Sequence, residues 1–327
     1  MAKARSVESK LAKVRSLRDG PSSPQRVDDL RTALGDASNL VAAEAAAIAG
    51  ELHITELTAD LVAAFDRFLD DPVKTDKLCR AKIAIAEALN QMEYADEDFF
   101  WRGARYEQFE PIWGGSQDAA APLRVACAFG LVRTRAHGAM PLLVDLLCDP
   151  EKIARAGAAQ ALAYSETDAA LLLLRLKARL GDKDPEVISE CFNGVLKLAP
   201  DDGVAFVAEF LEARDLARQE AAVLALGESR RPQAFEVLKA FWQKQPDRGL
   251  QETVLVALAL LRLPAATDFL LELVADESEA VATAALAALV PHRYDTRLRE
   301  RIAAAVARNG RATLQAVFEK RFRSNDE

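Results

Sequence analysis

The chain has 327 residues, of which half are hydrophobic and only 6% are aromatic, and its formal net charge is −8. Its apolar stretches are far shorter than the roughly 20 residues that a membrane-spanning helix needs, and its four cysteines form no CxxC pair. These features exclude a membrane span and a cysteine-based metal motif, and the abundance of Ala and Leu predicts an all-α fold.

The charge is unevenly distributed along the chain. Residues 1–31 hold eight Lys or Arg against four Asp or Glu, residues 293–323 hold nine against three, and the last four residues add −2, so that residues 32–292 carry −16. An acidic body repels a phosphate backbone, so we expect no nucleic acid on the main surface and favour a basic or amphipathic protein as partner. The alternative is that the acidic charge only keeps an Ala/Leu-rich protein soluble.

The N-terminal segment, residues 1–23, is basic and lacks the apolar core of a signal peptide. We expect it to form a capping helix of a cytoplasmic, monomeric protein. Cysteines in a reducing compartment behave as small apolar residues, so we interpret all four as reduced core thiols. They are Cys79, Cys127, Cys148 and Cys191.

A repeat of 30 to 40 residues occupies residues 24–292. Each repeat ends an Ala-rich segment with an apolar anchor: Ala49, Leu89, Phe129, Leu162, Leu196, Leu226, Leu258 and Leu289. The residues one and four positions before each anchor are apolar, and so are those eight before it, with Arg218 as the only exception. These offsets trace one stripe on an α-helix, and the small residues in the stripe predict close packing on the next helix.

A second amphipathic segment precedes most of these helices, and short polar breaks separate the two. Residues such as Asp184 and Asp215 in these breaks are typical N-caps. No sustained period-two alternation occurs, so we expect no sheet. Because no repeat can bury its stripe alone, we predict a right-handed α-α superhelix of about eight helical hairpins. Residues 293–327 are expected to supply basic capping helices, with a break at Asn309-Gly310.

Three segments carry a family resemblance: IARAGAAQALAYS at 153–165, LARQEAAVLALGES at 216–229 and EAVATAALAAL at 279–289. They resemble HEAT repeats of the short bacterial type, also called PBS-lyase HEAT-like. The resemblance implies a solenoid architecture. It does not imply one activity, because this repeat serves phycobilin lyase subunits, deoxyhypusine hydroxylase and phosphatase scaffolds.

An aromatic insertion at 94–118 interrupts the repeat. Seven of the 21 aromatic residues lie within its first 20 positions, 94–113, together with two arginines. We predict an ordered loop in which Glu110-Pro111 ends a helix, Gly114-Gly115 forms a turn and Asp118 starts the next helix. The candidate partner-binding residues are Trp101, Arg102, Arg105, Tyr106, Trp113 and Asp118. The alternative is that the aromatics form a small core that fills the gap between two repeats.

Catalytic motifs are absent from the sequence. His53, His137 and His292 form no metal-ligand pattern, and the His-Glu pairs of deoxyhypusine hydroxylase do not occur. Phosphate-binding and nucleophile-elbow motifs are also missing, and the acidic body does not fit the basic face of HEAT-like DNA glycosylases. We therefore expect a non-catalytic protein-interaction scaffold without cofactor or metal. The alternative function is an enzyme or enzyme subunit, phycobilin-lyase-like, that holds a bulky aromatic ligand near Trp101 and Trp113.

Overall fold

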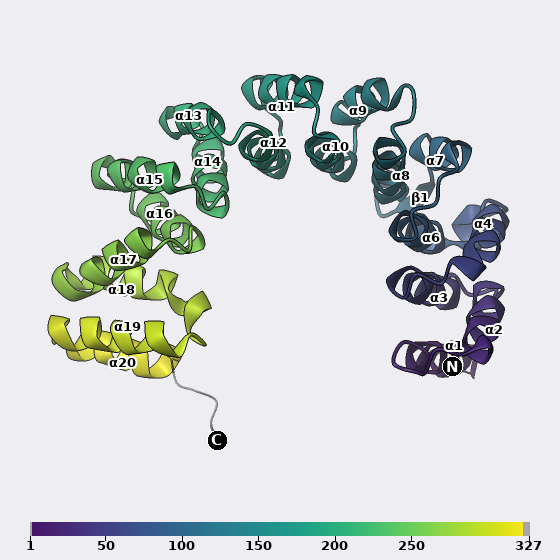
Figure 1. Ribbon diagram of the computed structural model, residues 1–327, viewed down its shortest axis with the longest axis horizontal. Coiled ribbons are helices and arrows are strands. Elements are labelled where there is room, and N and C mark those ends of the chain that lie inside the picture. The colour runs from purple at the N-terminus through teal and green to yellow at the C-terminus, as the bar shows by residue number, and fades with distance from the viewer. Residues whose placement is uncertain (1, 323–327) are drawn as a thin grey trace. The chain divides into compact units, whose positions relative to one another are not determined.

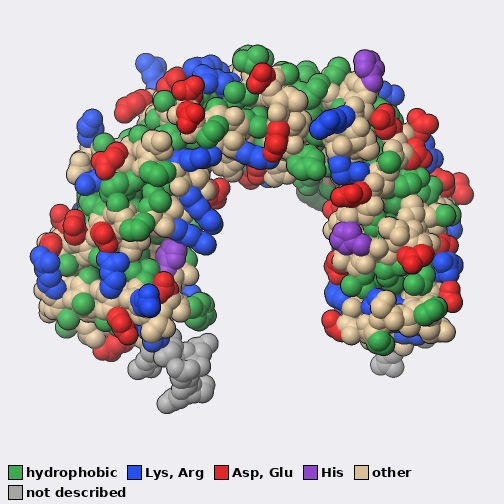
Figure 2. Space-filling model, in the orientation of Figure 1, with side chains coloured by type: hydrophobic (Ala, Val, Ile, Leu, Met, Phe, Trp, Pro, Cys, Tyr) green, Lys and Arg blue, Asp and Glu red, His purple; other side chains and the backbone are tan. Residues whose placement is uncertain are grey.

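The computed structural model describes residues 2–322, and this part of the chain is helical apart from one short hairpin (Figure 1). The chain forms two compact units, Met1–Glu166 and Thr167–Glu327. Each unit is a stack of paired helices, as predicted for a HEAT-like solenoid. Charged side chains are spread over the surface of both units, with apolar side chains exposed between them (Figure 2).

In the first unit, four helices pack on one another in succession, and we call them stacking helices: α3 (Asn39–Glu51), α6 (Arg80–Gln91), α8 (Ala121–Arg133) and α10 (Lys152–Ser165). A second set packs against these, and we call its members covering helices: α2 (Pro24–Leu34), α4 (Thr58–Arg67), α7 (Glu97–Ala104) and α9 (Ala139–Leu147). Helix α1 (Ala2–Ser16) packs on α3. The remaining elements are η1 (Thr55–Leu57), α5 (Pro72–Thr75), η2 (Lys77–Cys79), β1 (Phe109–Ile112) and β2 (Gly115–Asp118).

The second unit repeats this arrangement. Its stacking helices are α12 (Pro185–Leu198), α14 (Leu216–Glu228), α16 (Arg248–Leu260) and α18 (Glu279–Ala288). Its covering helices are α11 (Asp168–Leu180), α13 (Gly203–Ala208), α15 (Pro232–Lys244) and α17 (Pro264–Asp276). The other elements are η3 (Glu209–Glu212), η4 (Val290–His292), α19 (Thr296–Asn309) and α20 (Ala312–Phe322). Gly310 adopts a positive φ of 75° between the last two helices, which confirms the predicted break.

The polar breaks start helices as predicted. Asp184 and Asp215 are the N-cap residues of α12 and α14, and the Asp215 carboxylate accepts a hydrogen bond from the backbone N–H of Ala217. Such a bond satisfies one of the N–H groups that the first helical turn leaves without a partner. The Asp215 cap therefore helps to fix where α14 begins.

Burial confirms the predicted stripe in seven of the eight repeats. The anchors in these repeats are at most 4% exposed, and the residues one and four positions before them are buried too. In α14 and α16 the two backbones nearly touch, because a Cβ placed on Gly227 would lie only 2.7 Å from the Cα of Ala257. Small residues in the stripe are therefore a requirement of the stack.

The prediction that Phe129 is the third anchor is wrong. Phe129 is only half-buried, whereas Leu131 is fully buried, and so are Cys127 and Leu123 at four and eight positions before it. The physical reason is the insertion: the ring of Phe100 on α7 lies where a Cβ on Gly130 would stand, and this contact turns the Leu131 side of α8 toward the core. Two residues correspond to about 200° around a helix, so Phe129 faces away from the anchor position.

The expectation that no sheet occurs is also wrong, since β1 and β2 pair antiparallel within the insertion. Glu110-Pro111 lies in β1 and does not end a helix, while Gly114 makes the turn with a φ of 90°. Four-residue strands are too short to show a period-two pattern. The segment before them, Glu97–Ala104, is helix and not loop.

The cysteines are all free, but only three of them are core residues. Cys79, Cys127 and Cys191 are buried, and burial raises the pKa of each thiol, to about 12 for Cys79 and Cys191. Cys148, at the C-cap of α9, is exposed, contrary to prediction. It follows the last buried residue of a covering helix and has no stacking partner.

The register of the stack can be tested by overpacking. Ala257→Leu is expected to lower the free energy of unfolding by about 1–3 kcal/mol, because Ala257 is fully buried against the α14 backbone. Ala280→Leu, at an exposed position of α18, is the matched control and should leave the denaturation midpoint nearly unchanged. Equal urea denaturation curves for the two variants would show that the stripe is misassigned.

Candidate functional site

The insertion contributes a small buried aromatic cluster to the first unit. Phe99 and Phe100 on α7 are fully buried, with ring centroids 5.3 Å apart, and Phe65 of α4 lies 4.7 Å from Phe99 in an edge-to-face arrangement. The Asp96 side chain caps the helix that carries them by accepting from the backbone N–H groups of Asp98 and Phe99. Part of the aromatic insertion is therefore a core that fills the widened space between repeats.

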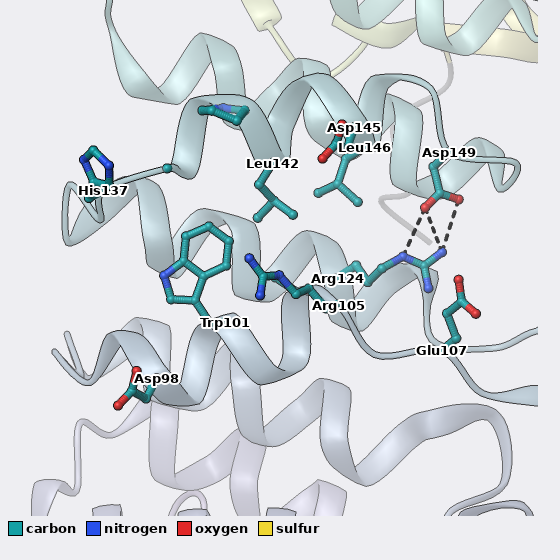
Figure 3. Close-up of a pocket in the computed structure, with 13 residues that line it drawn as sticks. Asp98, Trp101, Arg105, Glu107, Arg124, His137, Leu142, Asp145, Leu146 and Asp149 are labelled. Atoms are coloured by element: carbon teal, nitrogen blue, oxygen red, sulfur yellow. Dashed lines mark hydrogen bonds and ion pairs between the residues drawn. The ribbon is translucent and has the colours of Figure 1, made fainter.

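The opposite face of α7 opens into a cleft of about 680 Å³ between α7 and α9 (Figure 3). Trp101 forms its floor, and the guanidinium of Arg105 lies 4.7 Å from the indole ring centroid, a cation–π contact. Leu142 and Leu146 of α9 supply the apolar wall across from the indole. The cleft thus joins an aromatic face to an apolar wall.

Three carboxylates line the same cleft: Asp98 on α7, near Trp101, Glu107 before the hairpin, near Arg124, and Asp145 on α9. All three are exposed, and within residues 2–322 none of them has a hydrogen bond or an ion pair. Arg105 is the cation that faces them without an ion pair of its own, and its guanidinium is placed over Trp101. The cleft therefore carries an excess of unpaired negative charge.

Arg124 fixes the inner end of the cleft. Its guanidinium donates to both carboxylate oxygens of Asp149 at 3.1 Å, to the carbonyl oxygen of Tyr106 at 3.0 Å and to the carboxylate of Asp118. Asp118 in turn accepts from the backbone N–H groups of Gln108 and Ala120. Since each of these bonds is charge-assisted, both ends of the hairpin are held rigidly.

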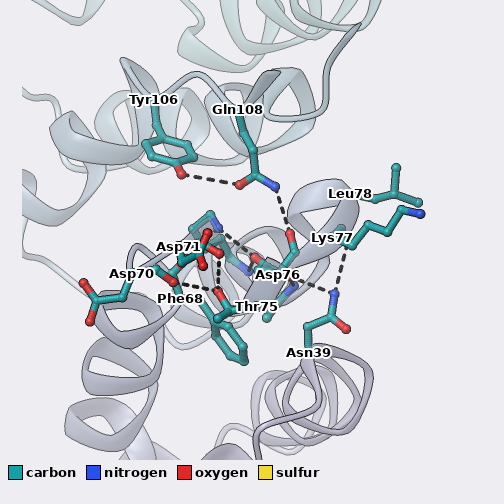
Figure 4. Close-up of polar contacts among 12 residues, drawn as sticks. Asn39, Phe68, Asp70, Asp71, Thr75, Asp76, Lys77, Leu78, Tyr106 and Gln108 are labelled. Carbon is teal, nitrogen blue, oxygen red and sulfur yellow. Dashed lines mark hydrogen bonds and ion pairs between the residues drawn. The ribbon is translucent and has the colours of Figure 1, made fainter. Parts of the chain in front are cut away.

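A second buried network attaches the hairpin to the preceding repeat (Figure 4). Asp76 and Lys82 are fully buried, and the Lys82 ammonium donates to the Asp76 carboxylate at 2.9 Å and to the Phe68 carbonyl at 3.0 Å. The Gln108 side-chain amide donates to the Asp76 carbonyl at 2.8 Å. A buried ion pair needs such additional bonds to offset desolvation. The network therefore requires the hairpin to be in place.

These surroundings shift two pKa values. Burial alone would raise the pKa of Asp118, but hydrogen bonds from Gln108, Ala120 and Arg124 and the Arg124 charge hold it below its usual value. Burial raises the pKa of Tyr106 to about 12, and nearby negative groups add to the shift. Tyr106 is therefore a neutral phenol, and Asp118 an anion, at physiological pH.

The structure separates the predicted partner-binding residues. Trp101 and Arg105 line the cleft together, and Trp113 is fully exposed at the tip of the hairpin. Arg102 points elsewhere, to an exposed ion pair with Asp66 at 2.8 Å. Tyr106 is half-buried beneath the hairpin, where Lys82 lies 5.3 Å from its ring centroid.

Asp118 does not start a helix, since Ala120 is the N-cap of α8, and Asp118 is buried. Its carboxylate is occupied by Arg124 and by two backbone N–H groups. These bonds give it a structural place that a partner does not reach. The sequence prediction recognised an acidic residue after the Gly-Gly turn but not its partner six residues later.

Most of the cleft residues that the sequence prediction missed lie in helices, and Glu107 lies in the segment between α7 and the hairpin. Asp145, Leu142 and Leu146 come from α9, in the next repeat, and Asp98 precedes Trp101 by less than one turn. The only signal in the sequence is an acidic residue in the apolar covering helix α9. Among the described residues, no group of three or more His, Cys, Asp or Glu side chains could hold a metal ion, and no helix is long and apolar enough to cross a membrane.

Comparison with known proteins identifies the repeats. Residues 204–290 match the family model of HEAT repeats, which confirms the resemblance over that part of the chain. No curated protein matches the sequence. The match to HEAT repeats thus lies within the second unit.

Three solved structures show weak likeness. A chain from the complex of CpcE and CpcF of phycocyanin lyase from Nostoc sp. PCC7120 is 20% identical, with 72% of this chain and 91% of that chain covered and a TM-score of 0.35. An engineered protein is 19% identical, with coverages of 98% and 91% and a TM-score of 0.37. Human deoxyhypusine hydroxylase in complex with glycerol is 16% identical, with coverages of 78% and 98% and a TM-score of 0.31. At these TM-scores the likeness does not bear on function.

The Asp118 clamp predicts a pH-dependent stability. Asp118→Asn is expected to lower the free energy of unfolding by about 1–3 kcal/mol at neutral pH, because buried donors lose a charged acceptor. Since the folded-state pKa is depressed, this contribution is complete above the unfolded-state value of 3.8 and is lost as the pH falls through the folded-state value. Thermal melts of wild type and variant should differ at pH 7 and converge in strong acid. The control Asp66→Asn, in an exposed pair, should change little at either pH.

Truncation of Trp113 at the exposed tip and truncation of Phe99 in the buried cluster should change the free energy of unfolding by very different amounts. Trp113→Ala is expected to change the free energy of unfolding by less than about 0.5 kcal/mol, because the side chain is fully exposed. Phe99→Ala should cost about 3–5 kcal/mol through loss of a buried ring. Urea denaturation measures both, and a large loss with Trp113→Ala would mean that the tip is part of the core.

Proposed function

We propose that this chain is a non-catalytic HEAT-repeat scaffold that binds a basic segment of another protein in the cleft between α7 and α9. The observation that carries the proposal is the set of unpaired carboxylates, Asp98, Glu107 and Asp145, that line the same cleft as the Trp101 indole. Aromatic floors with acidic rims suit Lys and Arg side chains, since the ring face attracts a cation and the carboxylates pair with it.

Arg105 indicates how such a cation would sit. Its guanidinium already lies over Trp101 at 4.7 Å, so the indole face accommodates a planar cation. Arg105 is exposed, and a partner's Lys or Arg could pack beside it while reaching Asp145 on the far wall. Glu107 would then compensate the additional positive charge.

The rigidity of the insertion supports a binding role. The Arg124 and Asp76 networks hold the hairpin and the end of α7 in place before any partner arrives, so that little ordering entropy is lost on binding. Trp113, at the hairpin tip, offers an additional aromatic contact. The acidic middle of the chain would raise the association rate of a basic partner, and salt would screen this effect over about 8–10 Å.

A second candidate function is an enzyme subunit that holds a bulky aromatic ligand. The volume of the cleft, about 680 Å³, favours it, since small-molecule sites commonly have about 300–1,000 Å³. Stacking on Trp101 would then anchor an aromatic ring instead of a guanidinium. The unpaired carboxylates favour the cationic partner, because a neutral ring would leave them without a counterion.

The proposal is tested by affinity capture from the native cell followed by binding measurements with the purified partner. We expect Trp101→Ala and Asp145→Asn each to raise the dissociation constant at least about tenfold. The association rate should fall as the ionic strength rises.

Tyr294→Ala provides the matched control, because Arg293 lies 4.6 Å from the Tyr294 ring centroid in an exposed cation–π pair of the second unit. This variant should bind normally. Unchanged binding by both cleft variants would contradict the proposal. Loss of a captured aromatic small molecule, with protein binding unaffected, would favour the second candidate.

A further inference from the structure

The stacking helices of the first unit present apolar residues at a position where three of the four stacking helices of the second unit carry glutamate. The position six residues before the buried anchor lies on the solvent-accessible side in every repeat. With Leu131 as the third anchor, the first unit has Ala43, Ile83, Val125 and Ala156 at this position. The second unit has Glu190, Glu220, Glu252 and Thr283. A glutamate side chain is well solvated on an exposed helix face. The apolar residues at this position in the first unit therefore need another explanation.

This surface is hollowed into a groove of about 560 Å³ across α6, α8 and α10. The rings of Phe129 and Tyr164 lie 5.6 Å apart and bridge α8 and α10. Ile153 is 52% exposed and Tyr164 is 47% exposed, although both are large and mainly apolar. Pro122 and Val125 complete the apolar wall. The groove belongs to the stacking helices, whereas the Trp101 cleft lies between covering helices.

Polar groups at the α6 edge of the groove lack donors. The Glu87 carboxylate has no hydrogen-bond or ion-pair partner within residues 2–322, and desolvation by its neighbours raises its pKa. One turn later, the Asn90 side-chain amide donates to the Ala126 carbonyl at 2.6 Å, but its own carbonyl oxygen is buried without a donor. Glu87 is exposed to water, whereas a buried acceptor such as the Asn90 side-chain oxygen is rarely left without a donor.

Among the described residues that line the groove, Arg133 is the only basic one, and its guanidinium already makes a hydrogen bond. The Arg133 guanidinium donates to the Tyr94 carbonyl and lies 5.8 Å from the Phe100 ring centroid, on the side of α8 that meets the insertion. It therefore does not neutralise Glu87. Apart from Arg133, whose Nε is buried without an acceptor, the groove is lined by apolar residues along α8 and α10, and it presents hydrogen-bond acceptors, one of them anionic, along α6.

We propose that this groove binds an amphipathic helix of another protein, with its apolar face against Phe129, Ile153 and Tyr164 and a Lys or Arg at Glu87. A helix is the suitable occupant because it satisfies its own backbone hydrogen bonds. The groove walls are themselves helices, whose backbone groups are already paired, so an extended segment would lose hydrogen bonds to water without replacement. The site is separate from the Trp101 cleft and does not depend on that cleft's function.

The test uses two model helical peptides that share one leucine face and carry either lysine or glutamine on the flanking positions. Fluorescence anisotropy of each labelled peptide is measured with the full chain. Wild type should bind the lysine peptide more tightly, and Ile153→Glu should weaken it at least about tenfold, because a charge would be buried in the apolar wall. Glu87→Gln should abolish most of the preference for lysine over glutamine. Val125 is a poorer choice for substitution because it packs directly against Gly157.

Two controls make the outcome decisive. Val256→Glu places the same charge on a half-exposed position of α16, in the second unit, and should leave binding unchanged. Trp101→Ala should also leave it unchanged, so that failure of this site and failure of the cleft are distinguishable. The proposal is overturned if wild type binds neither peptide, if Ile153→Glu has no effect, or if Val256→Glu weakens binding equally.

Discussion

The close approach of successive stacking helices is the constraint on which the rest of the structure depends. Gly50 lies so near Ala88 that a Cβ would stand 2.7 Å from the Ala88 Cα, and Gly227 and Ala257 repeat the relation in the second unit. Within a unit, an inner stacking helix such as α6 or α14 uses two sides for its neighbours and a third for its covering helix. Only one face remains free, and only that face can vary without cost to the stack.

The insertion is the place where the stack is widened, and it is held by polar bonds instead of small residues. Lys82 and Asp76 lose their hydration completely, and Arg124 and Asp118 nearly so. Buried ion pairs add little net stability but discriminate strongly against arrangements that leave one charge alone. This explains why a short hairpin, which would be marginal in isolation, can hold its shape with Trp113 exposed at its tip.

The sequence predicted the stack well because the repeat itself encodes the packing: small apolar residues at helical spacing permit few other arrangements. It failed at Phe129, which was predicted as the anchor although Leu131 holds that position. An aromatic residue satisfies an apolar sequence pattern on either side of a helix. The hairpin was missed because its pairing is local and its strands are mostly exposed. Asp118 was assigned to a partner because its true counter-charge, Arg124, belongs to α8, and spacing alone does not show that the two side chains meet.

Helix α8 links the two candidate sites physically. Its Arg124 holds the hairpin and closes one end of the cleft, while Val125 and Phe129 line the groove on another side of the same helix. The orientation of α8 is fixed by Phe100, whose ring occupies the space that the missing Cβ of Gly130 leaves open. A contact inside the insertion therefore determines that Leu131 is buried and that Phe129 faces the groove. The aromatic insertion shapes the free face of the stack as well as the cleft. Both surfaces therefore depend on the same interruption of the repeat.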